Sequence, residues 1–154
     1  MLAPWSHKSE VGTASDQSCA LATAAAPGET RRDGVDVSHR GGPPGFVRID
    51  DATDGSVLTF PDFRGNHFFN TLGNIVAHPH AGLLIVDWTN GDLLQLTGDA
   101  RVILDPREAA RYPGALRLVE LRVREHVRIP GAVPMRWSEP RYASQLAMTG
   151  PWSA

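Results

Sequence analysis

The longest regular pattern in the chain is an alternation of residue types over residues 92–104. A repeat of two residues places successive side chains on opposite faces of a β-strand. One face would carry Leu94, Leu96, Gly98, Ala100, Val102 and Leu104, and the other would carry Leu93, Gln95, Thr97, Asp99, Arg101 and Ile103. A strand of this length can reach around a barrel, and a glycine near its middle marks a bend. The segment therefore predicts a curved antiparallel sheet.

Shorter strand patterns lie on both sides of this segment. They cover residues 19–25, 35–38, 46–49, 57–60, 81–88 and 121–129. Asp-Gly at 54–55 and Asn-Gly at 90–91 are hairpin signals, and the continuous apolar run at 81–88 predicts a strand buried on both faces. Helical patterns are found at residues 66–77 and 106–112. Short strands with one or two short helices predict a mostly β fold, as an antiparallel barrel in preference to a parallel sheet.

The size and composition predict a single domain with a hydrophobic core. The chain has 154 residues, of which 42% are hydrophobic and 21% are charged, and these values are ordinary for a globular protein. Residues 1–17 show little periodicity and predict a flexible N-terminal arm, so the domain would occupy residues 18–154. The formal net charge of −2 provides no basic field for nucleic acid, so any anion site must be built locally.

The cysteine content and the lengths of the apolar runs bear on the compartment. Cys19 is the single cysteine, which excludes an internal disulfide and fits a reducing cytoplasm. We expect it to be a small core residue, since no neighbouring group in the sequence would lower its pKa. No apolar run approaches the roughly 20 residues of a membrane-spanning helix. We therefore expect a cytoplasmic protein that does not enter the membrane.

Groups suited to ligand binding are densest in residues 60–74. Asn66, Asn70 and Asn74 recur every four residues, so a helix over 66–77 would place their amides along one face. Arg64 and Gly65 would come just before the start of that helix, where free backbone N–H groups and the helix dipole favour an anion. The stretch predicts a site for a phosphate or a polar ring. An ordinary capped loop is the alternative, because asparagine and glycine are also turn residues.

Other charged and aromatic residues predict structural roles. The alternating basic residues Arg122, Arg124, His126 and Arg128 predict the solvated face of the last strand. His67, His78 and His80 lie near one another in the sequence, but without cysteine or a Glu-x-x-His partner they predict no metal site. Trp88, Trp137 and Trp152 predict anchors in the core or at a dimer interface.

Four segments of the chain carry a resemblance to a known family. They are residues 38–46 (SHRGGPPGF), 60–66 (FPDFRGN), 70–74 (NTLGN) and 94–100 (LQLTGDA). In this order they resemble the pyridoxamine 5'-phosphate oxidase-like family of FMN-binding split barrels. The resemblance implies a six-stranded antiparallel split β-barrel of Greek-key type. It also implies a homodimer, with FMN in a groove between the subunits.

The resemblance also implies which residues hold the cofactor. These are Ser38, His39, Arg40, Gly41, Pro61, Asp62, Arg64, Gly65, Asn66, Asn70, Thr71, Asn74 and Gln95. Arginine side chains and backbone amides suit the flavin phosphate, and the amides of Asn66 and Gln95 suit the carbonyl and N–H groups of the ring edge. Hydride or electron transfer would be the work of the cofactor, so no catalytic residue of the chain is implied.

The C-terminal region departs from the pattern of true pyridoxamine phosphate oxidases. Residues 132–137 (AVPMRW) and 149–152 (TGPW) stand where those enzymes carry an Arg-Leu-His substrate motif, so we do not expect the vitamin B6 reaction. This ending resembles instead a subgroup in which a ferredoxin reductase-like module can follow the barrel. The chain could therefore correspond to the detached barrel of such a fusion.

The expected function is that of an FMN-dependent oxidoreductase or electron-transfer protein. Its electron donor would be NAD(P)H, another small molecule or a ferredoxin reductase-like module. Two alternatives remain open from the sequence. One is a non-catalytic module that binds or senses flavin, haem or deazaflavin, and the other is a barrel that serves only for dimerisation.

Overall fold

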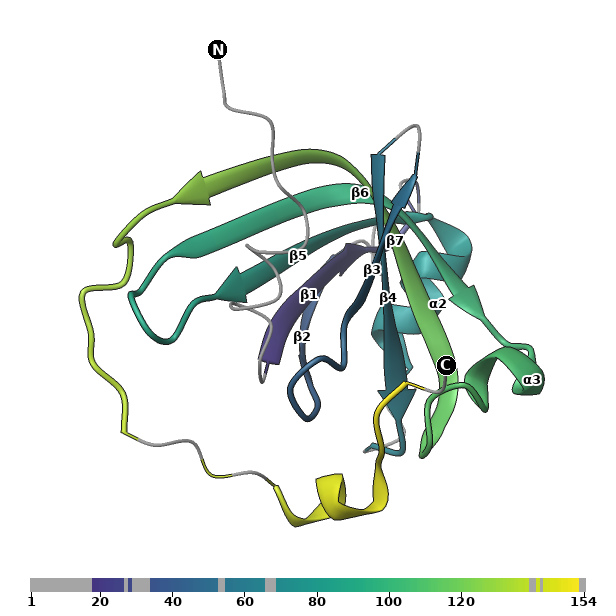
Figure 1. Cartoon of the computed structure of the whole chain (residues 1–154). Helices are drawn as coiled ribbons and strands as arrows, with labels where there is room; N and C mark the ends of the chain where they lie inside the picture. Colours follow the sequence, from purple (N-terminus) through teal and green to yellow (C-terminus); the bar gives the residue numbers. More distant parts are fainter. Residues whose placement is uncertain are drawn as a thin grey trace.

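The computed structural model describes residues 18–26, 28, 34–52, 55–65, 69–138, 141 and 143–152, so the predicted arm at 1–17 lies outside the described residues. Within them the chain forms one seven-stranded sheet, two short helices and a 3₁₀ helix (Figure 1). The strands are β1 (Ser18–Ala24), β2 (Val35–Gly41), β3 (Arg48–Ala52), β4 (Gly55–Phe63), β5 (His80–Val86), β6 (Leu93–Ile103) and β7 (Ala115–Ile129). The helices are α2 (Asn70–Ala77), α3 (Pro106–Ala109) and η1 (Ser144–Met148). The prediction of a mostly β fold is confirmed.

All neighbouring strands of the sheet are antiparallel, in the order β2-β1-β5-β6-β7-β4-β3. Strands β5, β6 and β7 form a meander. Strand β4 precedes the meander in the chain but pairs with its last strand, β7, which is a Greek-key arrangement. The sheet has seven strands where the resemblance implied six. The difference arises because residues 48–52 pair with β4 along their whole length and so form a strand of their own, β3.

Strand β4 is paired on both sides over only part of its length. Residues 55–59 pair with β3, whereas Phe60, Pro61 and Asp62 pair with β7 and lie beyond the end of the β3 ladder. Proline lacks an N–H and is tolerated in a sheet where that position faces away from a ladder. The C-terminal part of β4 therefore presents one open side, and the strand runs to Phe63 instead of ending at residue 60 as the sequence pattern predicted.

The core lies inside the curved sheet. Leu21, Leu58, Phe60, Ile85, Val119 and Leu121 have no exposed surface. In β5 burial alternates, with Leu83 and Ile85 buried and Leu84 half-buried, so the prediction of a strand buried on both faces is wrong. Only one face of this strand meets the core, and the other is partly covered.

The two helices are short and are set by local signals. Asp105 caps α3 by accepting a hydrogen bond from the Arg107 N–H at 2.8 Å, and Pro106 occupies the first turn. This helix ends at Ala109, before the predicted end at 112, because Tyr112 turns inward and is buried. In α2 the buried residues are Thr71, Leu72 and Ile75, while Asn66 lies outside the described residues. No helix in the described residues is long and apolar enough to cross a membrane.

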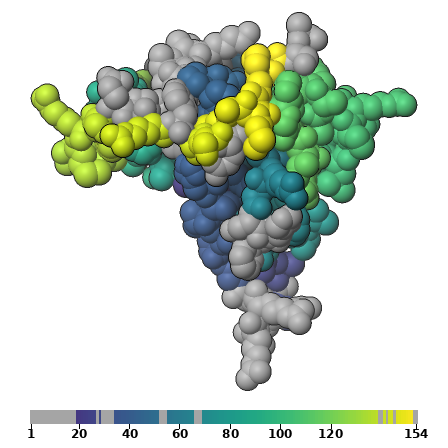
Figure 2. Space-filling model, turned by 90° about the horizontal axis from the view of Figure 1, so that it is seen from below, coloured from purple at the N-terminus to yellow at the C-terminus, as the bar shows by residue number. Residues whose placement is uncertain are grey.

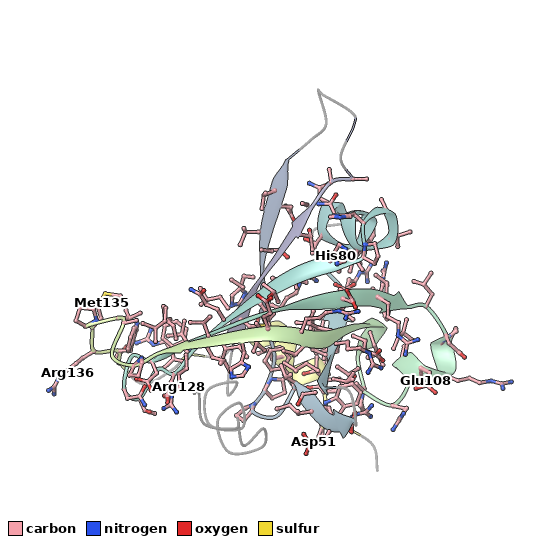
Figure 3. The ribbon with its side chains drawn as sticks, turned by 90° about the horizontal axis from the view of Figure 1, so that it is seen from above. Asp51, His80, Glu108, Arg128, Met135 and Arg136 are labelled. Carbon is pink, nitrogen blue, oxygen red and sulfur yellow. The ribbon has the colours of Figure 1, made fainter. Side chains whose placement is uncertain are left out.

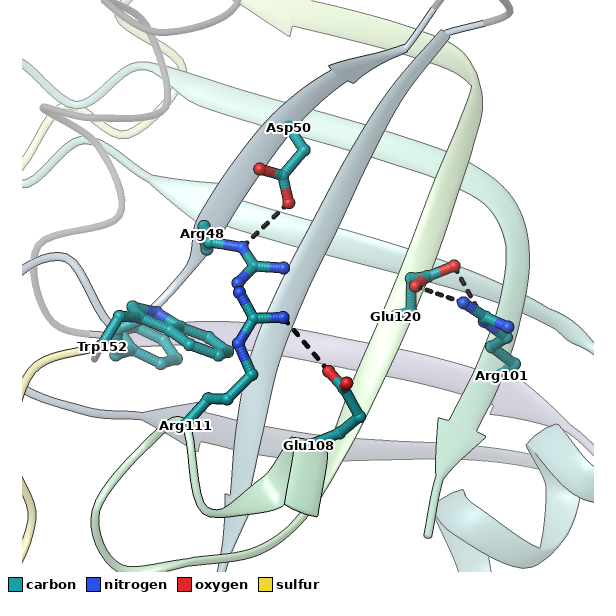
Figure 4. A network of polar contacts seen from close by, with 8 residues as sticks. Arg48, Asp50, Arg101, Glu108, Arg111, Glu120 and Trp152 are labelled. Carbon is teal, nitrogen blue, oxygen red and sulfur yellow. Dashed lines mark hydrogen bonds and ion pairs between the residues drawn. The ribbon is translucent and has the colours of Figure 1, made fainter. Parts of the chain in front are cut away.

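The prediction of one basic face on β7 is wrong, because the register shift near Gly98 changes the alternation of β7. In the strand register Arg122 pairs with Asp99, whereas His126 and Arg128 pair with the buried Leu96 and Leu94. Ion pairs tie two of these arginines to the β6 side of the sheet. Arg124 pairs with Asp99, and Arg128 lies 2.7 Å from Asp92. Arg101 of β6 makes a two-pronged contact with Glu120, at 2.9 and 2.8 Å (Figure 4). Arg128 lies toward the end of the sheet that also carries Met135 and Arg136 (Figure 3).

After β7 the chain crosses back along the lower side of the barrel (Figure 1). The Trp88 and Trp137 rings meet edge to face at 5.0 Å near the start of this return. At its end Trp152 donates from Nε1 to the Phe46 carbonyl at 3.1 Å, and its ring packs against Tyr112 at 5.1 Å. The Arg48 guanidinium lies over the same indole (Figure 4). Three of the four tryptophans therefore act as anchors within the chain.

The bend predicted at Gly98 is a β-bulge. The register between β6 and β7 shifts between Thr97 and Gly98. A Cβ atom at residue 98 would lie 1.9 Å from the Arg122 carbonyl oxygen, so only glycine allows the two strands to approach here.

Replacing Gly98 with alanine should lower the free energy of unfolding by about 3 kcal/mol, because the backbone of β7 must move to admit the methyl group. Gly82→Ala is the matched control, since a Cβ at that strand position meets its nearest atom at 3.8 Å and should change stability by less than about 1 kcal/mol. Urea denaturation of both variants measures the difference. Equal stability of the two variants would contradict the role of the bulge.

Candidate functional site

A buried carboxylate joins three strands at the open side of β4. Asp62, which is 6% exposed, forms an ion pair with Arg40 of β2, and its other oxygen lies 3.2 Å from Nε of Arg117 on β7. Strands β2 and β4 are not neighbours in the sheet. The side chains therefore close a gap that the backbone ladder leaves open, and two guanidiniums offset one carboxylate there.

Arg117 is a site residue that the sequence analysis missed. It is paired with Asp62 in the β4–β7 register, and its guanidinium lies 5.1 Å from the centre of the Phe69 ring. The sequence did contain a signal for Arg117, because residues 117, 119 and 121 lie on the same face of a strand and Val119 and Leu121 are buried. An arginine that continues a core-facing alternation needs a buried partner, and Asp62 is that partner.

The start of α2 is held against β2 by a second polar cluster. The Thr71 hydroxyl makes hydrogen-bond contacts with the Asp36 carboxylate and, at 2.9 Å, with the Ser38 hydroxyl. One turn later, the Asn74 amide donates to Thr23 Oγ1 of β1 at 3.1 Å. Phe69 at the N-cap has no side chain that caps the helix. The first-turn N–H groups of α2 are therefore not satisfied by a capping side chain.

Two adjoining pockets open around these clusters. The larger, which we call the polar groove, has a volume of about 970 Å³ and is lined by Asp36, Val37, Ser38, His39, Arg40, Asp62, Phe63, Arg64, Gly65, Phe69, Asn70, Thr71, Leu72, Leu116 and Arg117. The smaller, the apolar pocket, has a volume of about 560 Å³ and is lined by His39, Arg40, Gly41, Pro61, Phe63, Arg64, Gly65, Gly114, Arg141, Ala143, Leu146, Met148 and Thr149. The two share the stretch from Phe63 to Gly65 and the pair His39 and Arg40.

Most of the predicted site residues come together at these pockets. Ser38, His39, Arg40, Gly41, Pro61, Asp62, Arg64, Gly65, Asn70 and Thr71 line one or both of them. Asn74 is instead used in docking α2 on β1. Gln95 is exposed on β6, between Leu84 and Val127, and lines neither pocket. Asn66 lies outside the described residues.

The charges of the polar groove favour an anion. Its lining includes three arginines (Arg40, Arg64 and Arg117) and two carboxylates (Asp36 and Asp62). Arg64 is exposed and makes no ion pair with any residue that the structure describes, and Nε of Arg40 is buried without a hydrogen-bond partner. These donors, together with the first-turn amides of α2, fit the oxygens of a phosphate. The groove therefore offers donors suited to an anionic group.

Other reactive groups lie outside this site. Cys19 is 4% exposed, and burial raises the pKa of its thiol to about 12, so it remains protonated near neutral pH. The rings of His78 and His80 meet edge to face at 4.7 Å. In the part of the chain that the structure describes, no three histidine, cysteine or acidic side chains are gathered as for a metal ion.

Comparison with protein-family models identifies the family. The model described as pyridoxamine 5'-phosphate oxidase matches residues 9–135, and the chain therefore belongs to this family, whose fold is the split barrel. The resemblance seen in the four motifs is confirmed. A search of curated proteins gives no match.

Solved structures share the fold at low sequence identity. HupZ of Group A Streptococcus is similar with a TM-score of 0.54 and 14% identity, over 77% of this chain and 89% of that one. A pyridoxamine 5'-phosphate oxidase-related, FMN-binding protein of Nostoc punctiforme PCC 73102 is similar with a TM-score of 0.51 and 15% identity, over 84% of this chain and 85% of that one. At such identities the likeness shows the fold alone.

Changing Asp62 to asparagine should lower the free energy of unfolding by about 2–3 kcal/mol, since it leaves two partly buried guanidiniums without their shared counter-ion. Glu120→Gln is the matched control, because its partner Arg101 is 68% exposed and such a pair contributes about 1 kcal/mol or less. Urea denaturation at neutral pH measures both. Similar losses in the two variants would show that the Asp62 cluster does not hold the barrel together.

Proposed function

We propose that this chain binds FMN in the polar groove and acts as a flavin-dependent oxidoreductase or electron-transfer protein. One observation carries the proposal: residues from four separate stretches of the chain meet in one groove with three arginines and two carboxylates among the described residues. The stretches are β2, the end of β4 with the residues after it, the start of α2 and the start of β7. Membership of the family and the FMN-binding description of the Nostoc protein support the choice of ligand.

The residues of the groove divide into those suited to the phosphate and those that position them. Arg64 and the first-turn amides of α2 would hold the phosphate, with the partnerless Nε of Arg40 as a further donor. Asp62 holds the guanidiniums of Arg40 and Arg117 in place. Thr71 positions Ser38 and the helix start. When bound, FMN would supply hydride or electron transfer.

We also propose that the groove is completed by a second copy of the chain. Three apolar side chains along the groove are largely exposed: Val37 at 63%, Phe69 at 50% and Leu116 at 53%. Exposed apolar groups around a binding groove are typical of an interface. Gln95, which lies away from the groove of its own chain, would then serve the groove of the partner.

The FMN site predicts the effect of removing Arg64. Arg64→Ala should weaken FMN binding about tenfold, because a charge-assisted hydrogen bond to phosphate contributes roughly 1.5 kcal/mol or more. Arg136→Ala is the matched control, since Arg136 is also exposed and lines neither pocket. Binding is measured from the flavin absorbance retained after desalting and by calorimetric titration. No FMN binding by the unchanged protein would overturn the cofactor assignment.

The same FMN-loaded sample separates the proposed activities. Anaerobic bleaching of the flavin band by NAD(P)H alone indicates an oxidoreductase. Bleaching only after a ferredoxin reductase is added indicates an electron carrier. A bound flavin that neither treatment reduces would contradict both and leave a binding module.

The proposed dimer predicts the effect of a charge at its interface. Val37→Lys should raise the dimer dissociation constant at least about tenfold, because the ammonium group would have to be buried without a partner. Val76→Lys is the control, since Val76 is 73% exposed on α2 and does not line the groove. Sedimentation equilibrium measures both. A monomeric unchanged protein, or equal weakening by both substitutions, would contradict the proposed interface.

A further inference from the structure

The apolar pocket is a second compartment beside the polar groove. Pro61 and Phe63 of β4 form one wall, and Leu146, Met148 and Thr149 of the C-terminal segment form the opposite wall. Figure 2 shows this segment, in yellow, lying between the blue strands and the green part of the chain that contains α3 and the start of β7. A volume of about 560 Å³ falls within the roughly 300–1,000 Å³ of small-molecule sites.

The C-terminal wall is fixed to the barrel at the C-terminal end of η1 and just beyond it. Trp152 is held by its hydrogen bond to Phe46 and by its ring contact with Tyr112. The Gly150 N–H donates to the Pro113 carbonyl at 3.3 Å. Gly114 has a φ of +90°, and a Cβ there would lie 3.0 Å from the Met148 carbonyl oxygen. The close approach of the segment therefore depends on a glycine and an aromatic anchor, and the pocket is built into the fold.

The charged side chains that the structure describes in this pocket are all basic. Among the described residues, the lining contains Arg40, Arg64 and Arg141 and no aspartate or glutamate. Arg40 is paired with Asp62, whereas Arg64 and Arg141 make no ion pair with any residue in the described part of the chain. The pocket thus combines an apolar wall with two guanidiniums that are available to an anion.

We propose that the apolar pocket binds a planar aromatic carboxylate or a similar organic monoanion, with Arg141 contacting its charged group and Met148 its ring. Such a ligand would lie next to the polar groove, since the pockets share His39 and the stretch 63–65. The idea that this carboxylate is the substrate of the enzyme rests on the proposed FMN function. The idea that the apolar pocket binds such a carboxylate is independent of FMN.

A pair of matched probes tests the site: 2-naphthoate, which is anionic, and 2-naphthamide, which has the same ring system without the charge. Calorimetric titration of the unchanged chain should give binding of 2-naphthoate. Arg141→Gln should weaken 2-naphthoate about threefold to tenfold, as expected for loss of one exposed charge-assisted contact, and should change 2-naphthamide less than about twofold. Arg136→Gln, remote from the pocket, should leave both probes unchanged.

A substitution in the apolar wall of the pocket tests the site independently. Met148 is 77% exposed, so Met148→Asp should fold normally and weaken both probes, the anion more strongly. Met135→Asp is the control, since Met135 is 61% exposed and does not line the pocket. Absence of 2-naphthoate binding, or binding that neither Arg141→Gln nor Met148→Asp weakens, would overturn the proposal.

Repeating the 2-naphthoate titration with FMN present separates this inference from the proposed function. An affinity within about twofold of that without FMN supports two separate compartments. Complete competition by FMN would overturn the second site, because both ligands would then occupy one pocket. Binding of 2-naphthoate by a chain that does not retain FMN would preserve the site while refuting the flavin-based role.

Discussion

The shared carboxylate of Asp62 is the interaction on which the rest of the structure depends. The barrel is not closed by backbone hydrogen bonds between β2 and β4, and the Arg40 and Arg117 contacts join those strands to β7 instead. Closing the gap with side chains has two effects. It leaves room for a groove that a continuous ladder would fill, and it fixes guanidiniums at the edge of that groove. The same contact thus serves the fold and the site.

The sequence predicted the sheet because its signals were local. Each signal depends on residues within one strand or hairpin. The signals are the alternation at 92–104, the Asn-Gly turn and the short strand patterns. The errors arose where tertiary contacts decide. Residues 81–88 form an apolar run, yet only one face of β5 meets the core, and the helix expected to reach 112 ends at Ala109 because Tyr112 is needed inside. The strand pattern at 46–49 already indicated β3 (Arg48–Ala52), and only the resemblance implied a sheet without it.

The candidate site was predictable to a similar degree. Motifs at 38–41, 61–65 and 70–71 meet at the pockets, and their role in cofactor binding stays a prediction. Arg117 and the C-terminal wall were missed for different reasons. Arg117 continues the alternation of Val119 and Leu121, but its role at the site becomes clear only from its register with Asp62. Residues 143–149 have no periodic pattern and reach the pocket through the distant contact of Trp152 with Phe46, which no local signal specifies.

Pro61 protects the open side of β4. An unpaired strand edge recruits other strands, and the usual safeguards include a proline on that edge. Beyond the β3 ladder, β4 has Pro61, which lines the apolar pocket. A residue that cannot donate a backbone hydrogen bond discourages strand addition there. The missing amide hydrogen of Pro61 thus protects the edge of β4 beside the apolar pocket against strand addition.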